Sequence, residues 1–408
     1  MTKTSAVHPS DILGFSRLAM DATVKLSDVV EAMHLNIARA PGILGRPATG
    51  PARGITGLVY QSIRTVAGLV GSGIDTALAP LIPLLGERSS PPGREAMIAA
   101  LNGVMGDYLA ATRNPLAICM SLRRNGRPLA LERRALSRAI PGLGGKLLVL
   151  AHGLCMNDLQ MTRKGHDHGA ALARDLGYTP VYLHYNSGLH VSTNGRAFAQ
   201  LIETLIDQWP APLEEFAIVG HSMGGLVARS AYHYASMTGH DWPRHLRKVV
   251  FLGSPHHGTP LERGGNWLNV ALGFSPYTAA LARLGQIRSA GITDLRYGNL
   301  LDDDWRGRDR FDASPDLRCL MPLPDKVKCY AIAATTGKFL GDGVVPVDSA
   351  LGRHKDPRRT LSFAKSRQWV GYGMNHFDLL SEPAVYERIK RWLGRGADTL
   401  PAQSPTSH

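Results

Sequence analysis

The fold is decided by Phe216-Ala217-Ile218-Val219-Gly220-His221-Ser222-Met223-Gly224-Gly225, in which a short apolar run leads into a turn with glycines on both sides of a serine. Residues 223–237 then read as a helix. Glycines are needed there because side chains would collide in so sharp a strand-to-helix turn. A serine in this setting is typical of a nucleophile elbow, and the stretch predicts Ser222 as a catalytic nucleophile.

Short apolar runs alternate with helical stretches on both sides of this turn. The runs are 146–151, 179–185, 216–220, 248–253, 328–334 and 368–372. Strands that are apolar throughout and alternate with helices are typical of a parallel sheet covered on both faces. Asn125-Gly126, between 116–121 and 127–131, predicts a hairpin whose strands are antiparallel. The predicted class is therefore α/β, with an eight-stranded, mostly parallel sheet.

The remaining segments suggest the domain organisation. Residues 1–110 form a helical region with apolar residues at three- and four-residue steps, and residues 113–396 carry the sheet. Within the sheet domain, 259–324 is too long for a simple crossover and is predicted to be a cap or lid. Residues 397–408 are expected to be a disordered tail. The stretch 65–86 is long enough to span a membrane, but Asp75, glycines and prolines favour a packed or membrane-surface helix.

Composition narrows the class of partner and the compartment. The net charge of +13 comes without a basic run interleaved with aromatic residues, so we expect no nucleic-acid binding. The four cysteines show neither a Cys-x-x-Cys pair nor zinc spacing, and no phosphate-binding glycine loop occurs, so no cofactor is expected. The first residues lack the features of a signal peptide, which predicts a cytoplasmic protein. Contact with a lipid surface through residues 1–110 is a further prediction.

Two backbone amides are the candidates for an oxyanion hole. One belongs to Met223, the residue after the nucleophile. The other is expected from the loop after 147–150, where His152-Gly153-Leu154 offers the Leu154 amide on a path that the glycine keeps open. His152 is expected to brace this loop rather than to act as a base.

The acid and the base should follow the nucleophile in that order. Asp342 lies between two glycines just past the run 328–334, and His376 follows the last run, 368–372. Asp348 is the reserve candidate for the acid. His256 and His257 precede Asp342 and so break the order, which leaves them as residues that shape the loop or line the pocket.

The predicted substrate-binding residues lie in the loops around the nucleophile; they are His152, Gly153, His221, His256 and His257.

One further pattern, His166-Asp167-His168, has two interpretations. Two histidines one residue apart suggest a metal site, but no third ligand lies near them in the sequence. A helix that begins after Asp167 and is stabilised by its carboxylate is the favoured interpretation. We therefore expect no metal.

Residues 146–393 resemble the lipase branch of the α/β hydrolases, and within it the bacterial relatives of GPI inositol-deacylases and lecithin:cholesterol acyltransferases. The resemblance is carried by His152-Gly153, Gly-His-Ser-Met-Gly-Gly at 220–225, Gly-Ser-Pro-His-His-Gly at 253–258, Gly-Asp-Gly-Val-Val-Pro at 341–346 and Asn375-His376. It implies an α/β-hydrolase fold, a triad of Ser222, Asp342 and His376, and an ester of a fatty acyl or similar apolar group as substrate.

These patterns together predict a serine hydrolase that cleaves carboxylic esters through an acyl-enzyme, with a small-molecule or lipid ester as its partner. The same triad would serve an acyltransferase or a storage-polyester depolymerase, because the pocket selects the acceptor. The alternative from another class is a non-catalytic protein that binds a lipid or a partner through 1–110.

Overall fold

The computed structural model describes residues 92–259, 288–309, 315–337 and 341–394, together with 10–11, 13–21, 24, 61 and 65. These residues divide into two compact units. The smaller combines the described residues of 10–65 with Ala111–Ala117, and the larger begins with Pro91–Ala110 and continues from Ile118.

The smaller unit contains helical residues between positions 10 and 24. Leu13 and Leu116 are buried in it. The Asn114 side-chain amide donates a hydrogen bond to the Gly14 carbonyl oxygen at 3.0 Å, and this contact ties the helix to the segment 111–117. The predicted membrane-surface helix, 65–86, lies outside the described residues apart from Thr65.

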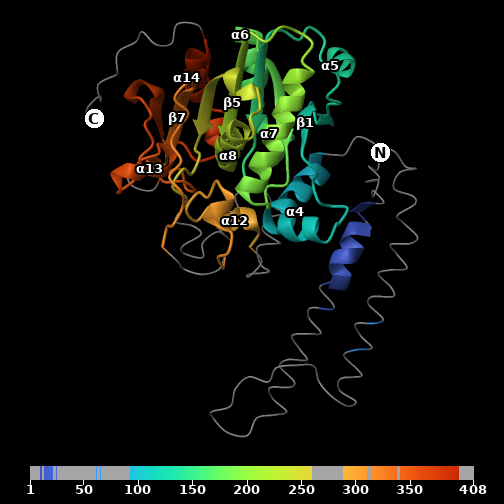
Figure 1. The fold of residues 1–408 in the computed structure, drawn as a ribbon. Coiled ribbons are helices and arrows are strands. Elements are labelled where there is room, and N and C mark those ends of the chain that lie inside the picture. Colours follow the sequence, from blue (N-terminus) through green and yellow to red (C-terminus); the bar gives the residue numbers. More distant parts are fainter. Residues whose placement is uncertain are drawn as a thin grey trace. The chain divides into compact units, whose positions relative to one another are not determined.

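The larger unit is built on one eight-stranded sheet (Figure 1). Its strand order is β2-β1-β4-β3-β5-β6-β7-β8, and all pairs from β4 to β8 are parallel, whereas β1 runs antiparallel to both of its neighbours. The predicted α/β class and strand count are confirmed. The strands are β1 (Ser121–Arg124), β2 (Arg127–Pro128), β3 (Lys146–Ala151), β4 (Thr179–His184), β5 (Glu215–His221), β6 (Leu246–Leu252), β7 (Lys328–Thr335) and β8 (Gln368–Tyr372).

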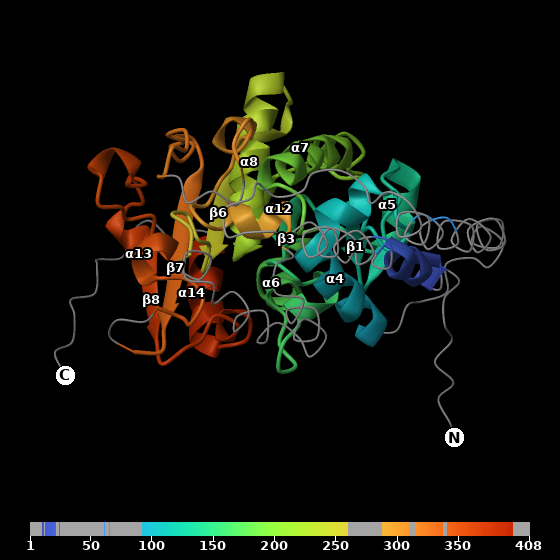
Figure 2. The same ribbon diagram turned by 90° about the horizontal axis from the view of Figure 1, so that it is seen from below.

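Helices cover both faces of the sheet. They are α4 (Pro92–Ala111), α5 (Arg133–Ala139), α6 (His168–Leu176), α7 (Val191–Asp207), α8 (Met223–Thr238), α12 (Ala290–Asp294), α13 (Val347–Ala350) and α14 (Pro383–Leu393). Helices α7 and α8 pack on each other, as do α6 and α14. Figure 2 shows the first pair on one side of the sheet and the second pair on the other.

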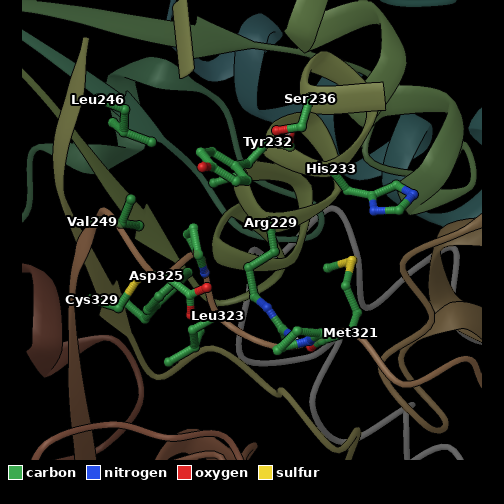
Figure 3. Close-up of a pocket in the computed structure, with 14 residues that line it drawn as sticks. Arg229, Tyr232, His233, Ser236, Leu246, Val249, Met321, Leu323, Asp325 and Cys329 are labelled. Atoms are coloured by element: carbon green, nitrogen blue, oxygen red, sulfur yellow. Dashed lines mark hydrogen bonds between the residues drawn. The ribbon is translucent and has the colours of Figure 1, made fainter. Parts of the chain in front are cut away.

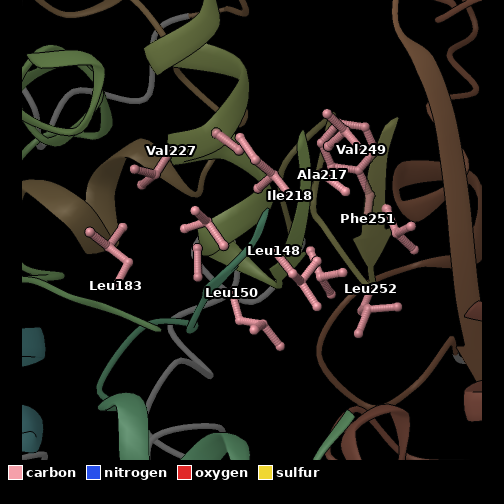
Figure 4. Packing of buried hydrophobic residues seen from close by; sticks show 14 of the residues in the cluster. Leu148, Leu150, Leu183, Ala217, Ile218, Val227, Val249, Phe251 and Leu252 are labelled. Atoms are coloured by element: carbon pink, nitrogen blue, oxygen red, sulfur yellow. The ribbon is translucent and has the colours of Figure 1, made fainter. Parts of the chain in front are cut away.

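Strand register explains why each face receives its own helices. Ala151 of β3 is aligned through β5 with Phe251 of β6, while Leu150, one residue earlier, points to the opposite face. Gly225 of α8 lies against Phe251, and Gly169 of α6 lies against Leu150. Strands β3 to β7 are largely buried on both sides, as their uninterrupted apolar runs require (Figure 4).

The hairpin is present, but its first strand was predicted too early. Asn125 and Gly126 have positive φ angles of 52° and 74° and form the expected tight turn, whereas β1 begins at residue 121 and not at 116. The reason is that a nearby side chain, and not a neighbouring strand, hydrogen-bonds to the backbone here. The Leu116 amide donates to Asn114 Oδ1 at 3.0 Å, which satisfies it without a neighbouring strand.

Helix α4 lies N-terminal to the predicted domain boundary at 113, yet it belongs to the sheet-containing unit. Asn186 Nδ2 donates to the Gly106 carbonyl oxygen at 2.8 Å, and the Ile118 amide donates to Asn102 Oδ1 at 2.9 Å. The boundary itself stays a prediction because residues 66–91 are outside the described part, as are 260–287 of the predicted cap and the whole predicted tail.

Candidate active site

Ser222 occupies a strained turn between β5 and α8. Its φ of 54° and ψ of −125° place a non-glycine residue in a sparsely populated region, at a cost of about 1–3 kcal/mol. The Ser222 amide donates to the Leu252 carbonyl oxygen at 2.8 Å, which ties the turn to the end of β6. The side chain is 3% exposed. Strand, turn and helix thus have the form that the sequence predicted for an elbow.

Gly220 shows why this turn requires glycine. A Cβ at this position would lie 2.6 Å from the backbone nitrogen and Cα of Gly225, and backbone atoms have no rotamer by which to move away. We expect Gly220→Ala to lower the free energy of unfolding by about 2 kcal/mol or more. Urea denaturation measures the change.

Gly144 offers a matched control, because a Cβ there would meet nothing within 4 Å and the residue has no positive φ. We expect Gly144→Ala to leave the unfolding midpoint close to that of the wild type. Equal destabilisation by the two substitutions would contradict the steric explanation.

Asp342 and His376 form a buried hydrogen-bonded pair. His376 Nδ1 lies 2.7 Å from Asp342 Oδ2, and the His376 amide donates to the Asp342 carbonyl oxygen at 3.0 Å. Asp342 Oδ1 accepts hydrogen bonds from the amides of Val344 and Val345 at 2.9 and 2.7 Å. The carboxylate is therefore held from both sides, and it fixes the orientation of the imidazole.

The other imidazole nitrogen, His376 Nε2, is buried and has no hydrogen-bond partner among the described residues. The ring lies over Gly253, where a Cβ would be 3.1 Å from Nδ1 and Cε1. Leu252, the preceding residue, is the one bonded to the Ser222 amide. Ser222, Asp342 and His376 thus follow the carboxyl ends of β5, β7 and β8, at one edge of the sheet and in the chain order that the sequence predicted.

The loop after β3 runs beside the nucleophile. A Cβ at Gly153 would lie 3.0 Å from Ser222 Cβ, so only glycine allows the loop to come so close. Neither the Leu154 amide nor the Met223 amide donates a hydrogen bond to a described residue. Both N–H groups thus meet one requirement for oxyanion donors, since they are not occupied by the protein.

His152 braces this loop from below. Its Nδ1 donates to the Gly153 carbonyl oxygen at 2.8 Å, and its ring stacks on Tyr185 with 4.3 Å between centroids. The Tyr185 hydroxyl donates to the His152 carbonyl oxygen at 2.9 Å. Ser187 Oγ accepts from the Cys155 amide at 3.0 Å. Burial lowers the pKa of His152 to about 3, so the ring stays neutral and structural.

Tyr185 and Ser187 were not predicted from the sequence. Their signal was their place directly after β4, because the carboxyl ends of parallel strands share one edge of the sheet.

His221 lies against the histidine of the pair. Its Nε2 donates to the His376 carbonyl oxygen at 3.2 Å, and the two ring centroids are 4.7 Å apart. Burial, together with the neighbouring His376, lowers the pKa of His221 well below its ordinary value. The contact steadies the loop that carries His376, whereas the predicted role of His221 in substrate binding stays a prediction.

His256 and His257 lie in a different setting. Both line a polar pocket of about 190 Å³ whose walls do not include Ser222, Asp342 or His376. Their predicted role in substrate binding stays a prediction, because this pocket does not include the three candidate catalytic residues.

Asp167 caps helix α6, as the favoured interpretation of the sequence predicted. Its Oδ1 accepts from the Ala170 amide at 2.8 Å. His166 Nε2 and His168 Nδ1 are 2.9 Å apart and share a hydrogen bond. Over the residues that the structure describes, no three side chains are grouped to hold a metal ion.

Buried histidines predict acid sensitivity. Burial lowers the pKa of His168 to about 4 and that of His152 to about 3. Below pH 6.5 these histidines bind protons in the unfolded chain but stay neutral in the folded protein. The free energy of unfolding therefore decreases as the pH is lowered. Each group contributes about 1.4 kcal/mol per pH unit until its folded pKa is reached. We expect about 3 kcal/mol to be lost between pH 6.5 and 5 from these two groups.

The change in the free energy of unfolding per pH unit is the slope to be measured, by urea denaturation at several pH values. His168→Gln should reduce it by about one proton between pH 6 and 4.5, since one titrating group is removed. A slope that His168→Gln leaves unchanged would contradict this account.

The strand order and the elbow together define the α/β-hydrolase fold. Residues 182–316 match the family model described as "PGAP1-like alpha/beta domain", in agreement with the resemblance to α/β hydrolases found in the sequence. The matched part includes the elbow and the Gly-Ser-Pro-His-His-Gly motif but ends before Asp342 and His376. No curated protein matches the chain.

Solved structures with detectable similarity include a lipase from Bacillus licheniformis, at 20% identity over 59% of this chain and 87% of that chain, with a TM-score of 0.36. Phospholipase PlaB from Legionella pneumophila shows 17% identity over 50% of this chain and 45% of that one, with a TM-score of 0.34. An esterase from Pyrococcus furiosus shows 13% identity over 62% and 82%, with a TM-score of 0.37. We base the fold on the strand order and the elbow. In the described part of the chain, no helix has the length and apolar character needed to cross a membrane.

Proposed function

We propose that the protein is a serine hydrolase that cleaves carboxylic esters of lipid-like or other apolar acyl groups. The observation that carries the proposal is the buried hydrogen-bonded pair of His376 and Asp342 beside a serine in a strained elbow. A hydroxyl is a weak nucleophile at neutral pH, and this is the set of groups that activates one.

In the proposed first step, Ser222 Oγ attacks the ester carbonyl carbon while His376 Nε2 takes its proton. The charge that develops on the carbonyl oxygen is stabilised by the amides of Met223 and Leu154. His376 then gives the proton to the leaving alcohol, and the acyl group stays on Ser222. Asp342 keeps the imidazole in the required tautomer and stabilises its charged form.

In the second step, water loses a proton to His376 and attacks the acyl-enzyme, which releases the acid and restores Ser222. If an alcohol takes the place of water, the same reaction steps give acyl transfer, so the triad does not select the acceptor. Product analysis in the presence of competing alcohols separates hydrolysis from transfer.

A panel of p-nitrophenyl esters from acetate to palmitate tests the proposal. We expect turnover of at least one ester, with a preference among chain lengths that reports the acyl site. The absence of turnover with every ester, in a protein that is folded by circular dichroism, would contradict the proposed function. Contact with a lipid surface through 1–110 and a cytoplasmic location stay predictions.

A further inference from the structure

A second pocket lies on the face of the sheet that α8 covers. Its volume is about 330 Å³, at the lower end of the range for small-molecule sites. It is lined by α8, by β6, by Cys329 near the start of β7, and by the segment 321–325 (Figure 3). Its walls are mainly apolar and include Ala228, Leu246, Val249, Phe251 and Leu323. Ser222, Asp342 and His376 are not among them. We call it the apolar chamber.

The polar pocket of about 190 Å³ that His256 and His257 line adjoins this chamber. We call it the basic chamber. The two share Arg229, Met321 and Pro322 as wall residues. An apolar volume therefore meets a basic one at the guanidinium of Arg229.

Arg229 is a buried charge that has no counter-ion among the described residues. It is 6% exposed, and none of the described carboxylates pairs with its guanidinium. Its contacts are His256 Nδ1, at 3.3 Å, and the Met321 carbonyl oxygen, and its Nε has no partner in the described structure. Burial, and then the charge of Arg318, lower the pKa of Arg229 to about 10, so it remains charged at neutral pH. A buried charge is costly unless it is paired.

His256 adds a second unpaired donor. Its Nδ1 accepts the hydrogen bond from Arg229, so the neutral ring carries its proton on Nε2. This Nε2 is buried and has no partner within the described part of the chain, in a residue that is 1% exposed. Arg229 Nε and His256 Nε2 thus both lack an acceptor in the part of the chain that the structure describes.

The other charged side chains at the chambers contact an oppositely charged group or are exposed. Asp316 holds Arg318 through two contacts of 2.9 Å and lies 3.6 Å from Arg359. Arg358 pairs with Asp356 at 2.8 Å. Asp325, at the wall of the apolar chamber, is exposed to solvent. Among the charges at the two chambers, Arg229 is therefore the buried guanidinium that no described carboxylate contacts, whereas Arg318 and Arg359 share Asp316.

We propose that the two chambers bind one amphiphile with a single chain and a monoanionic head group, a fatty carboxylate, with its head on Arg229 and His256 and its chain in the apolar chamber. Arg229 is the buried guanidinium that a head group would neutralise, and a single carboxylate matches the paired donors of one guanidinium. The site goes beyond the proposed function and does not depend on it, because none of the groups proposed for catalysis lines either chamber.

Calorimetric titration of the full-length protein with decanoate, below its micelle concentration, tests the site. We expect one decanoate per chain, and binding of 1-decanol weaker by about tenfold or more because the alcohol lacks the charge. Decyl sulfate, a monoanion with a different head, distinguishes any anion from a carboxylate. The proposal would be overturned if 1-decanol bound as tightly as decanoate, or if decyl sulfate bound more tightly than decanoate.

Two substitutions, one in each part of the proposed site, test where the bound decanoate lies. Arg229→Gln should weaken decanoate binding by about tenfold or more, whereas Arg358→Gln, which removes an exposed and already paired charge of the basic chamber, should not. Ser236→Trp should also weaken it, since the exposed Ser236 lies at the wall of the apolar chamber and a tryptophan there fills space.

The neighbouring Met237 is 74% exposed and does not line the chamber, so Met237→Trp is the matched control. Ser236→Trp leaves the buried Arg229 in place, and it decides the matter if Arg229→Gln fails to fold. Decanoate binding that survives Ser236→Trp unchanged would show that the chain lies elsewhere, for example near Ser222, and would overturn the proposal.

Discussion

Replacement of Ser222 by alanine should reduce kcat for p-nitrophenyl ester hydrolysis on the order of a million-fold. Without the hydroxyl no acyl-enzyme forms, and His376 has no proton to take. The amides of Met223 and Leu154 and the binding of the ester remain, so a small rate above that of water is expected to survive. The loss is measured from initial rates, at an enzyme concentration high enough for the residual catalysed rate to exceed the uncatalysed background rate.

Ser236→Ala is the matched control for this experiment. Ser236 is an exposed serine on the same helix, α8, and its hydroxyl donates only to the Tyr232 carbonyl oxygen. We expect its kcat to equal that of the wild type. Retention of more than about one percent of the activity by Ser222→Ala would mean that another residue is the nucleophile.

Replacement of Asp342 by asparagine should reduce kcat by about ten thousand-fold with little change in fold. The asparagine oxygen is expected to stay on the amides of Val344 and Val345, which donate to Oδ1 of the native carboxylate. Its NH₂ group then faces His376 Nδ1, where Oδ2 lies at 2.7 Å in the native protein. A donor at that point places the imidazole proton on Nε2, so His376 cannot accept the proton of Ser222.

Asp348, the reserve candidate for the acid, supplies the control for this substitution. Its side chain is 74% exposed and lies 3.6 Å from Arg353, with no contact to His376. We expect Asp348→Asn to keep the wild-type kcat, and both variants to keep the wild-type melting temperature within a few degrees. A loss of activity in Asp348→Asn together with full activity in Asp342→Asn would exchange their assignments.

The sequence was sufficient to predict the sheet and the order of the three candidate residues. Strands β3 to β7 are buried on both faces, so their apolar runs are uninterrupted and easy to find. Ser222 and Asp342 each follow such a run, and His376 follows the partly buried edge strand β8. Because the carboxyl ends of parallel strands meet at one edge, order along the chain was enough to bring them together.

Features that depend on contacts between distant segments could not be predicted in the same way. Tyr185 holds the loop of His152 through a hydrogen bond across 33 positions, and no local periodicity marks such a pair. His221 contacts the His376 carbonyl oxygen across 155 positions, a contact that the sequence did not indicate. The start of β1 was misplaced because a side chain, Asn114, took the backbone hydrogen bond that a strand would have supplied.

The second pocket was invisible in the sequence for a related reason. Arg229 looks like any other helical arginine, and only the packing of α8 against 321–325 reveals that it is buried without a carboxylate. The predicted roles of 1–110 and of the cap depend largely on residues outside the described part, and they stay predictions.

The most direct test of the central claim is to label the native protein with a fluorophosphonate and map the modified residue by mass spectrometry of its peptides. We predict a single covalent adduct, on the peptide that contains Ser222, and none in the His376→Ala variant over the same time, because labelling requires an activated hydroxyl. An adduct on a different serine, or ester hydrolysis that continues with Ser222 unlabelled, would contradict the proposal.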